Sequence, residues 1–101
     1  MNLDIRSLGF DLTPALLQHT ERRLAFALAR FTPLIRAVTV RLEDLNGPKG
    51  GLDKRCRVAA TLDGQAALRA EATGADLYAA IDAAADRLGR MVVRAKNRLE
   101  A

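Results

Sequence analysis

Four arginines near the end of the chain share one edge of a predicted helix. At about 100° per residue they fall within a sector of roughly 80°, beside the apolar stripe of that helix. They are Arg87, Arg90, Arg94 and Arg98. Arg90 follows Asp86 at a spacing of four, whereas no acidic residue stands four positions before Arg94 or Arg98. An unpaired guanidinium can donate two hydrogen bonds to one phosphate, so this row of arginines indicates phosphate binding.

A second group of cations lies on the helix predicted over residues 14–31. Arg22, Arg23 and Arg30 are partly offset there by Glu21. If the two helices lie side by side, their basic edges merge into one patch that suits the backbone of structured RNA, where recognition is mainly by shape. A competing interpretation is a solvated helix face whose charges only keep the protein in solution.

The composition is consistent with a nucleic-acid partner. The 101 residues allow one domain, residues 1–101, and 16 Lys and Arg against 12 Asp and Glu give a net charge of +4. A single cysteine, Cys56, excludes an intrachain disulfide and favours a reducing compartment. No signal peptide and no apolar run of about 20 residues are present, so we expect a cytoplasmic protein with no membrane partner.

The sequence offers no catalytic constellation. No nucleophile stands beside a base, and the glycines at 47–51 lack the Lys-Ser/Thr ending of a phosphate loop. One cysteine and one histidine cannot form a zinc site by themselves. We therefore expect no enzyme activity, no small-molecule substrate, no cofactor and no metal.

Strands and helices follow from the hydrophobic pattern. Period-two alternation predicts strands over 2–6, 35–42, 55–62 and 66–73, the last two joined by a tight turn at Asp63-Gly64. The glycine-rich stretch 46–51 predicts a mobile loop. The fold class is therefore α+β, with the order β-α-β-β-β-α, a four-stranded sheet and both helices packed on one face.

The two helices have recognisable starts and apolar stripes. Thr13 is a good N-cap before Pro14, and an apolar stripe of Leu17, Leu24, Leu28 and Phe31 follows. The second helix begins after Gly74-Ala75-Asp76 and keeps one stripe to the C-terminus. Together the helices are predicted to cover the apolar face of the sheet.

Several single residues allow two interpretations. Lys54, Arg55 and Arg57 either extend the basic surface onto the open face of the sheet or only protect it from edge pairing. Cys56 is in the apolar register of its strand and is expected to be buried. Tyr78 is expected to pack against the sheet edge rather than on a base, and His19 is more typical of a surface residue than of an RNA contact.

Asp76-Leu77-Tyr78-Ala79-Ala80-Ile81-Asp82, with the basic positions after it, resembles the signature helix of bacterial ribosome hibernation promoting factors and ribosome-associated translation inhibitors. The Thr13-Pro14-Ala15-Leu16 helix start, Gln18-His19 and Arg23-Leu24 are similar to the same family. The resemblance covers nearly the whole chain and implies the fold order given above. It also implies binding to the small ribosomal subunit near the decoding centre, which idles translation under stress.

The resemblance implies RNA contacts at Arg23, Arg87, Arg90 and Arg94, with Lys96 and Arg98 as secondary candidates. With the first-helix cations, the predicted RNA-binding set is Arg22, Arg23, Arg30, Arg87, Arg90, Arg94, Lys96 and Arg98. Phe26 and Ala29 stand where many relatives carry lysine, so we expect that half of the patch to be weakened or relocated. The chain resembles a short form of a divergent branch, without the C-terminal dimerisation domain of long members, although self-association is possible.

Two other functions fit the same residues. One is a protein-interaction module that uses the open sheet face or a sheet edge, with a basic helix that only confers solubility. The other is binding to structured RNA outside the ribosome. The affinity for RNA falls steeply as the salt concentration rises, because binding releases counterions. The affinity of a protein contact through the sheet depends much less on salt.

Overall fold

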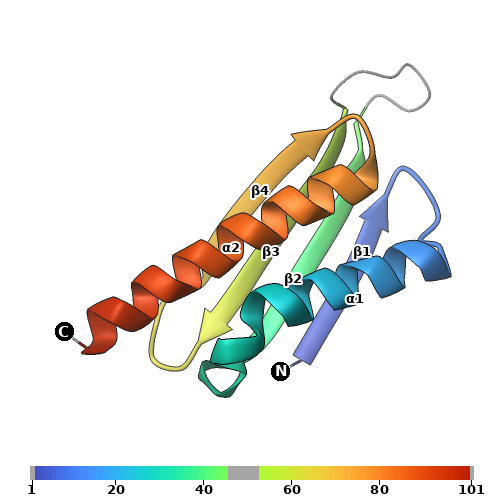
Figure 1. Cartoon of the computed structure of the whole chain (residues 1–101). Helices are drawn as coiled ribbons and strands as arrows, with labels where there is room; N and C mark the ends of the chain where they lie inside the picture. Colours follow the sequence, from blue (N-terminus) through green and yellow to red (C-terminus); the bar gives the residue numbers. More distant parts are fainter. Residues whose placement is uncertain (1, 46–52, 101) are drawn as a thin grey trace.

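The computed structural model describes residues 2–45 and 53–100, so the loop predicted over 46–51 lies outside the described residues. The elements, drawn in Figure 1, follow the predicted order β-α-β-β-β-α, which is confirmed. They are β1 (Asn2–Leu8), α1 (Pro14–Leu28), the 3-10 helix η1 (Ala29–Leu34), β2 (Ile35–Asp44), β3 (Lys54–Leu62), β4 (Leu68–Gly74) and α2 (Leu77–Glu100).

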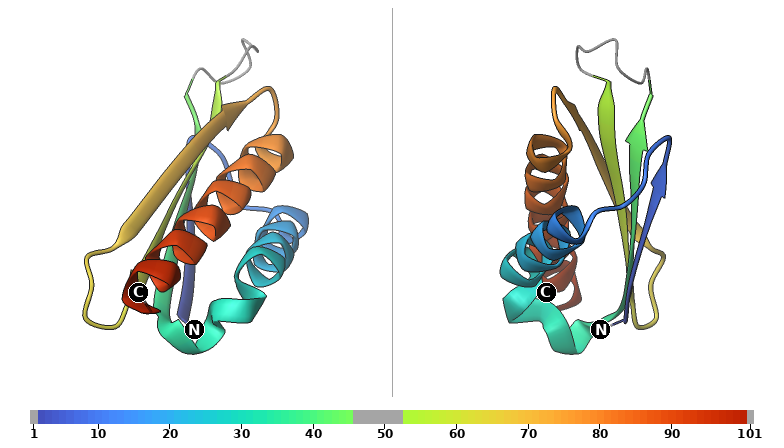
Figure 2. Two further views of the ribbon diagram at one scale, coloured as in Figure 1. Left: turned by 60° about the vertical axis from the view of Figure 1, so that its left-hand side comes forward. Right: turned by 90° about the vertical axis from the view of Figure 1, so that its right-hand side faces the viewer.

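The four strands form one mixed sheet in the spatial order β1-β2-β3-β4. β1 pairs parallel to β2, with Ile5 opposite Val40, and the other neighbours are antiparallel. A parallel pair needs a long crossover connection, and α1 supplies it. Both helices lie on one side of the sheet and leave the other side open (Figure 2), as predicted.

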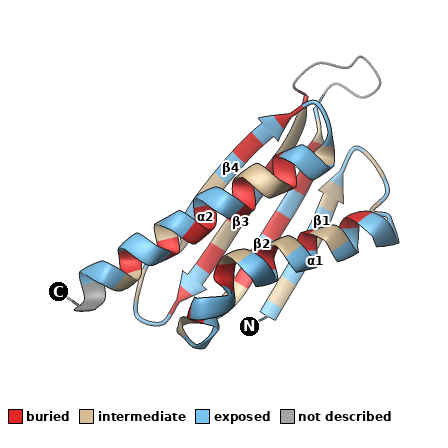
Figure 3. Ribbon diagram, viewed as in Figure 1, coloured by how far each residue is buried: buried red, intermediate tan, exposed pale blue. Residues whose placement is uncertain are grey.

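The core lies between the sheet and the helices. Alternate β2 residues Val38, Val40 and Leu42 point into it, and Leu88 and Val92 of α2, which packs over β3 and β4, are fully buried in the same core. Figure 3 shows the buried residues in the layer where helices meet strands. Period-two burial on the strands leaves every second side chain on the open face, which makes that face polar.

Helix α1 begins as predicted, because the Thr13 hydroxyl oxygen accepts a hydrogen bond from the Leu16 backbone N–H at 3.2 Å. The stripe it buries differs from the predicted one. Leu16 is buried whereas Leu17 is 37% exposed, so the placement of Leu17 in the core is wrong. Thr20 continues the Leu16 row at a spacing of four, and its burial is possible because its hydroxyl donates to the Leu16 carbonyl at 2.8 Å.

The end of α1 and the start of β4 also differ from the prediction. The α-helix ends at Leu28 and tightens into η1, which contains Pro33, because proline cannot donate the backbone hydrogen bond of an α-helical turn. A turn does form at Asp63-Gly64, where the Gln65 backbone N–H donates to the Leu62 carbonyl at 3.3 Å, but strand β4 begins at Leu68, two residues later than predicted, so the connection is longer than a two-residue hairpin. Gly64 has a positive φ of 73°, but a two-residue type I′ turn needs two such residues, and Asp63 is not one.

Candidate nucleic-acid interface

One edge of α2 carries the arginine ridge, defined as Arg87, Arg90, Arg94 and Arg98. This edge lies beside β4, since an Arg87 guanidinium nitrogen donates to the Glu71 carbonyl. Leu68 and Met91 form a shallow hollow of about 170 Å³ with Arg94 and Arg98. All four arginines are exposed, and among the side chains of residues 2–45 and 53–98 no carboxylate pairs with any of them. The ridge is therefore available to an anionic partner.

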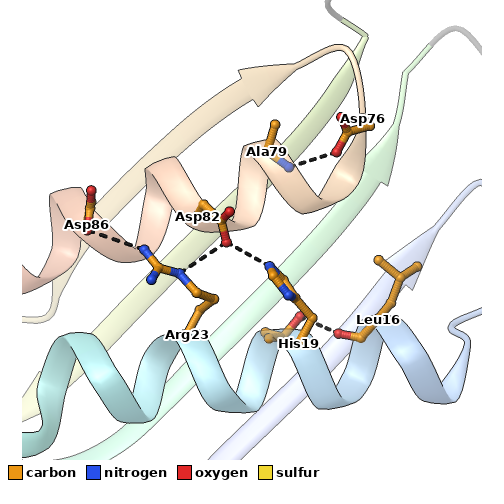
Figure 4. Close-up of polar contacts among 8 residues, drawn as sticks. Leu16, His19, Arg23, Asp76, Ala79, Asp82 and Asp86 are labelled. Atoms are coloured by element: carbon orange, nitrogen blue, oxygen red, sulfur yellow. Dashed lines mark hydrogen bonds and ion pairs between the residues drawn. The ribbon is translucent and has the colours of Figure 1, made fainter.

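The opposite edge of α2 is acidic and faces α1. The His19 Nε2 lies 2.7 Å from the Asp82 Oδ1, and the Arg23 Nε lies 3.1 Å from the same oxygen. A second Arg23 nitrogen lies 3.5 Å from the Asp86 Oδ1. Figure 4 shows these four side chains bridging the two helices. We call them the interhelix cluster: His19, Arg23, Asp82 and Asp86.

The basic edges of the two helices do not meet. The helices lie side by side (Figure 1), but carboxylates line the edge that α2 turns toward α1. Asp86 pairs with Arg23 rather than with Arg90, the partner that the sequence spacing suggested. The structure thus separates Arg23 from the arginine ridge and places it in the interhelix cluster.

The remaining candidate residues have different surroundings. Arg22 on α1 and Arg30 on η1 are exposed. Lys96 is half-buried, with its ammonium 5.8 Å from the centre of the Phe31 ring, a distance at which cation–π attraction operates. These three residues therefore stand apart from the continuous row formed by the arginine ridge.

Tyr78 packs on α1 rather than on the sheet edge, which corrects the prediction. Its ring makes an edge-to-face contact with His19 at a centroid distance of 4.9 Å. His19 is half-buried by this contact and by Asp82. A signal for the cluster was present in the sequence, since His19 and Arg23 are four residues apart, as are Asp82 and Asp86.

The rotation of α2 is fixed by a close approach of the helices. A Cβ added at Gly89 would lie 3.2 Å from the Ala27 carbonyl oxygen, so only glycine lets the helices pack at this distance without a shift. Because Gly89 faces α1, the acidic edge next to it must face α1 as well. The arginine ridge is consequently directed away from α1, toward β4.

The basic run at the start of β3 is largely paired within the chain. Lys54 lies 2.9 Å from Asp53 and 3.2 Å from Asp44, and these contacts raise the pKa of Lys54, the Asp53 hydrogen bond most strongly. Arg55 lies 2.7 Å from Glu43. That hydrogen bond is the main cause of the lowered pKa of Glu43, although burial opposes it. This favours the structural interpretation for Lys54 and Arg55.

The decisive comparison is with protein families. Residues 3–100 match the model of the family described as Sigma 54 modulation protein / S30EA ribosomal protein. The chain belongs to this family. The predicted resemblance is therefore confirmed.

Similar proteins support the assignment. The ribosome hibernation promotion factor of Bacillus subtilis (strain 168) is 34% identical over 101 residues, which cover 98% of this chain and 50% of that protein. The chain thus spans about half the length of this relative. The N-terminal domain of Thermus thermophilus Protein Y is 30% identical, with a TM-score of 0.76 over 93% of this chain and 98% of that one. A ribosomal subunit interface protein from Coxiella burnetii, 22% identical, shares the fold with a TM-score of 0.78 over 96% and 99%.

The family is not one of enzymes, in agreement with the sequence analysis. No helix in the described part of the chain has the length and apolarity to cross a bilayer. No group of three or more potential ligands among the described residues is placed to hold a metal ion.

Cys56 is buried as predicted, and burial raises its pKa to about 12.

Proposed function

We propose that residues 1–101 act as one ribosome-binding domain in the cytoplasm, which binds small-subunit rRNA through the arginine ridge and idles translation under stress. Family membership supports this role, and so does the name of the Bacillus subtilis relative, which identifies that protein as a ribosome hibernation promotion factor. The ridge supplies the means of binding.

The observation that carries the proposal is the geometry of the ridge. Its four arginines project from one edge of α2, exposed and without carboxylate partners among the described residues. From Arg87 to Arg98 the helix rises about 16 Å at 1.5 Å per residue, so several phosphates can be contacted in a row. Contacts to phosphates give affinity and position but no base specificity.

The other predicted contacts have secondary roles in this proposal. Arg22, Arg30 and Lys96 add to the positive potential around the ridge. Arg23 contributes only if it leaves Asp82 and Asp86. Self-association remains a prediction of the sequence analysis and is not needed for this mode of binding.

The direct test is sedimentation of the purified protein with small ribosomal subunits at several salt concentrations. We expect the wild type to sediment with the subunits at low salt and to dissociate steeply as salt rises. The variant Arg87→Ala/Arg90→Ala/Arg94→Ala should remain in the supernatant. Thermal unfolding of each variant checks that it is folded.

A matched control uses one arginine outside the ridge. Arg36 is exposed at the start of β2 and pairs with Asp63 at 3.2 Å. Arg36→Ala removes the same charge as Arg94→Ala, so only Arg94→Ala should weaken binding markedly. If the wild type does not bind subunits but binds other structured RNA, the ribosomal assignment is wrong. If binding occurs and is insensitive to both salt and Arg94→Ala, a protein contact through the sheet is favoured instead.

A further inference from the structure

The helices leave one face of the sheet open (Figure 2), and this open face carries a second set of arginines. A hollow of about 610 Å³ extends over all four strands there. Four arginines and two carboxylates line it, an excess of two positive charges: Arg6, Arg41, Arg57 and Arg69 with Asp4 and Glu71. This surface lies on the opposite side of the sheet from α2 and is separate from the arginine ridge.

The strand register brings like charges together on this face. Arg41 is directly opposite Arg6 on one side and Arg57 on the other. Like charges at directly opposite positions of neighbouring strands repel and destabilise the sheet. An anion bound among these side chains would relieve that repulsion, so the arrangement favours a negatively charged ligand.

Only part of this charge is balanced within the protein. Arg6 pairs with Asp4 at 3.2 Å, and Arg57 lies 3.5 Å from Glu71 and 3.6 Å from the buried Glu43. For Arg41 and Arg69 the described residues provide no ion pair and no hydrogen bond, although the charge of Arg41 acts on Glu43 at longer range. The two carboxylates that line the hollow are thus paired with Arg6 and Arg57. The guanidinium groups of Arg41 and Arg69 are available to bind a ligand.

The shape of the hollow indicates a chain of phosphates rather than one small anion. Adjacent strands lie about 4.8 Å apart, so β2 and β4 are separated by about 10 Å and Arg41 and Arg69 face different parts of a ligand. No aromatic side chain lines the hollow, so bases cannot stack on it as they do on many RNA-binding sheets. Recognition would rest on the phosphates.

We propose that the open sheet face is a second RNA-binding surface, in which Arg41 and Arg69 bind separate phosphates of one RNA strand. This goes beyond the proposed function, because it adds a contact on the side of the domain that the ridge does not reach. With both surfaces occupied, the domain is held between RNA segments on its two faces.

The test uses a labelled oligouridylate of about twelve nucleotides. Its affinity is measured by fluorescence anisotropy at several salt concentrations for wild type, Arg41→Gln, Arg69→Gln and the control Arg36→Gln. We expect Arg41→Gln and Arg69→Gln each to weaken binding several-fold more than Arg36→Gln does. Each should also reduce the slope of log K against log salt by about 0.7, the value for one phosphate contact on a single strand.

A second readout locates the contact. In NMR spectra of the whole chain, the side-chain Nε–H signals of Arg41 and Arg69 should shift on addition of oligouridylate. If only signals from the arginine ridge shift, or if both variants match Arg36→Gln, the proposal is wrong. If tripolyphosphate at equal phosphate concentration produces the same shifts and competes fully, the face binds small phosphates and the RNA assignment is overturned.

These outcomes are independent of ribosome binding through the ridge. Loss of subunit binding in the ridge variant, with Arg41→Gln and Arg69→Gln unchanged in both assays, would leave the proposed function in place and remove the second surface. Conversely, a wild type that never binds subunits but shows the Arg41 and Arg69 shifts would contradict the proposed function alone.

Discussion

His19 and Asp82, 63 residues apart in the sequence, join the two helices through a contact of 2.7 Å between the His19 Nε2 and the Asp82 Oδ1. Arg23 shares the same carboxylate at 3.1 Å. Asp82 therefore connects two side chains of α1 to α2. The contact fixes which edge of α2 faces α1 and, with it, which edge faces outward.

The first prediction concerns this connection. Asp82→Asn removes the charge that His19 and Arg23 share, so the free energy of unfolding should fall by about 1 kcal/mol, the upper range for partly exposed ion pairs. In a domain of this size the melting temperature should fall by roughly 4–8 °C. Asp63→Asn is the control, because Asp63 pairs with one exposed arginine, Arg36. An equal loss in both variants would show that the cluster stabilises the fold no more than a single exposed ion pair does.

The second prediction concerns the effect of the cluster on RNA binding. Asp86→Asn removes a carboxylate that holds Arg23 and lies on the same helix as the arginine ridge. Binding to small subunits at low salt should become about two- to three-fold tighter, and the gain should disappear at high salt. Asp63→Asn changes the net charge equally but lies in the β3–β4 connection, so it should have less effect. Sedimentation at matched salt measures the difference.

The third prediction is a pH dependence of stability at Glu43. The Arg55 hydrogen bond lowers the pKa of Glu43 below its ordinary value of 4.5, so the folded state favours the charged carboxylate. Its contribution is therefore present above pH 4.5 and is lost as the pH falls through the lower folded-state pKa. At neutral pH Glu43→Gln should reduce the free energy of unfolding by about 1.5–3 kcal/mol, as expected for a hydrogen bond to a charged group.

Urea unfolding of wild type and Glu43→Gln across this pH range provides the measurement. The difference between them should shrink as the medium becomes acidic. Glu71→Gln serves as the control, since Glu71 is 60% exposed and lies 3.5 Å from Arg57. A difference that stays constant down to the lowest pH would contradict the role assigned to the Glu43 charge.

The fourth prediction concerns the thiol of Cys56. The residue is fully buried, and burial raises its pKa to about 12, so the reactive thiolate is scarce at ordinary pH. A thiol reagent at mildly alkaline pH should label the native protein far more slowly than the urea-unfolded chain. Since the chain has one cysteine, mass spectrometry reports this site alone. Rapid labelling of the native protein would mean that β3 opens readily.

The sequence predicted the element order because the local patterns were strong. Alternation on the strands and the Thr13-Pro14 start are properties of neighbouring residues, and the structure repeats them. The predictions for Leu17 and Tyr78 were wrong because both depend on the neighbouring helix. The helical periodicity also predicted the arginine ridge on α2, because it gives the angular position of each side chain around the helix axis. It could not predict which neighbouring element the ridge lies beside, because that depends on how α2 packs. The Gly89 contact with Ala27 supplied that missing orientation.

The course of the ridge along α2 affects the approach to a partner as well as the bound state. Charges spread along a helix of 24 residues form a line rather than a point. In the field of a polyanion such a line experiences a torque, so the molecule turns lengthwise before contact is made. The association rate should then depend on ionic strength over the range in which the Debye length falls below the length of the ridge, about 16 Å. The same row of arginines would therefore orient the protein during its approach and contact the phosphates in the bound complex.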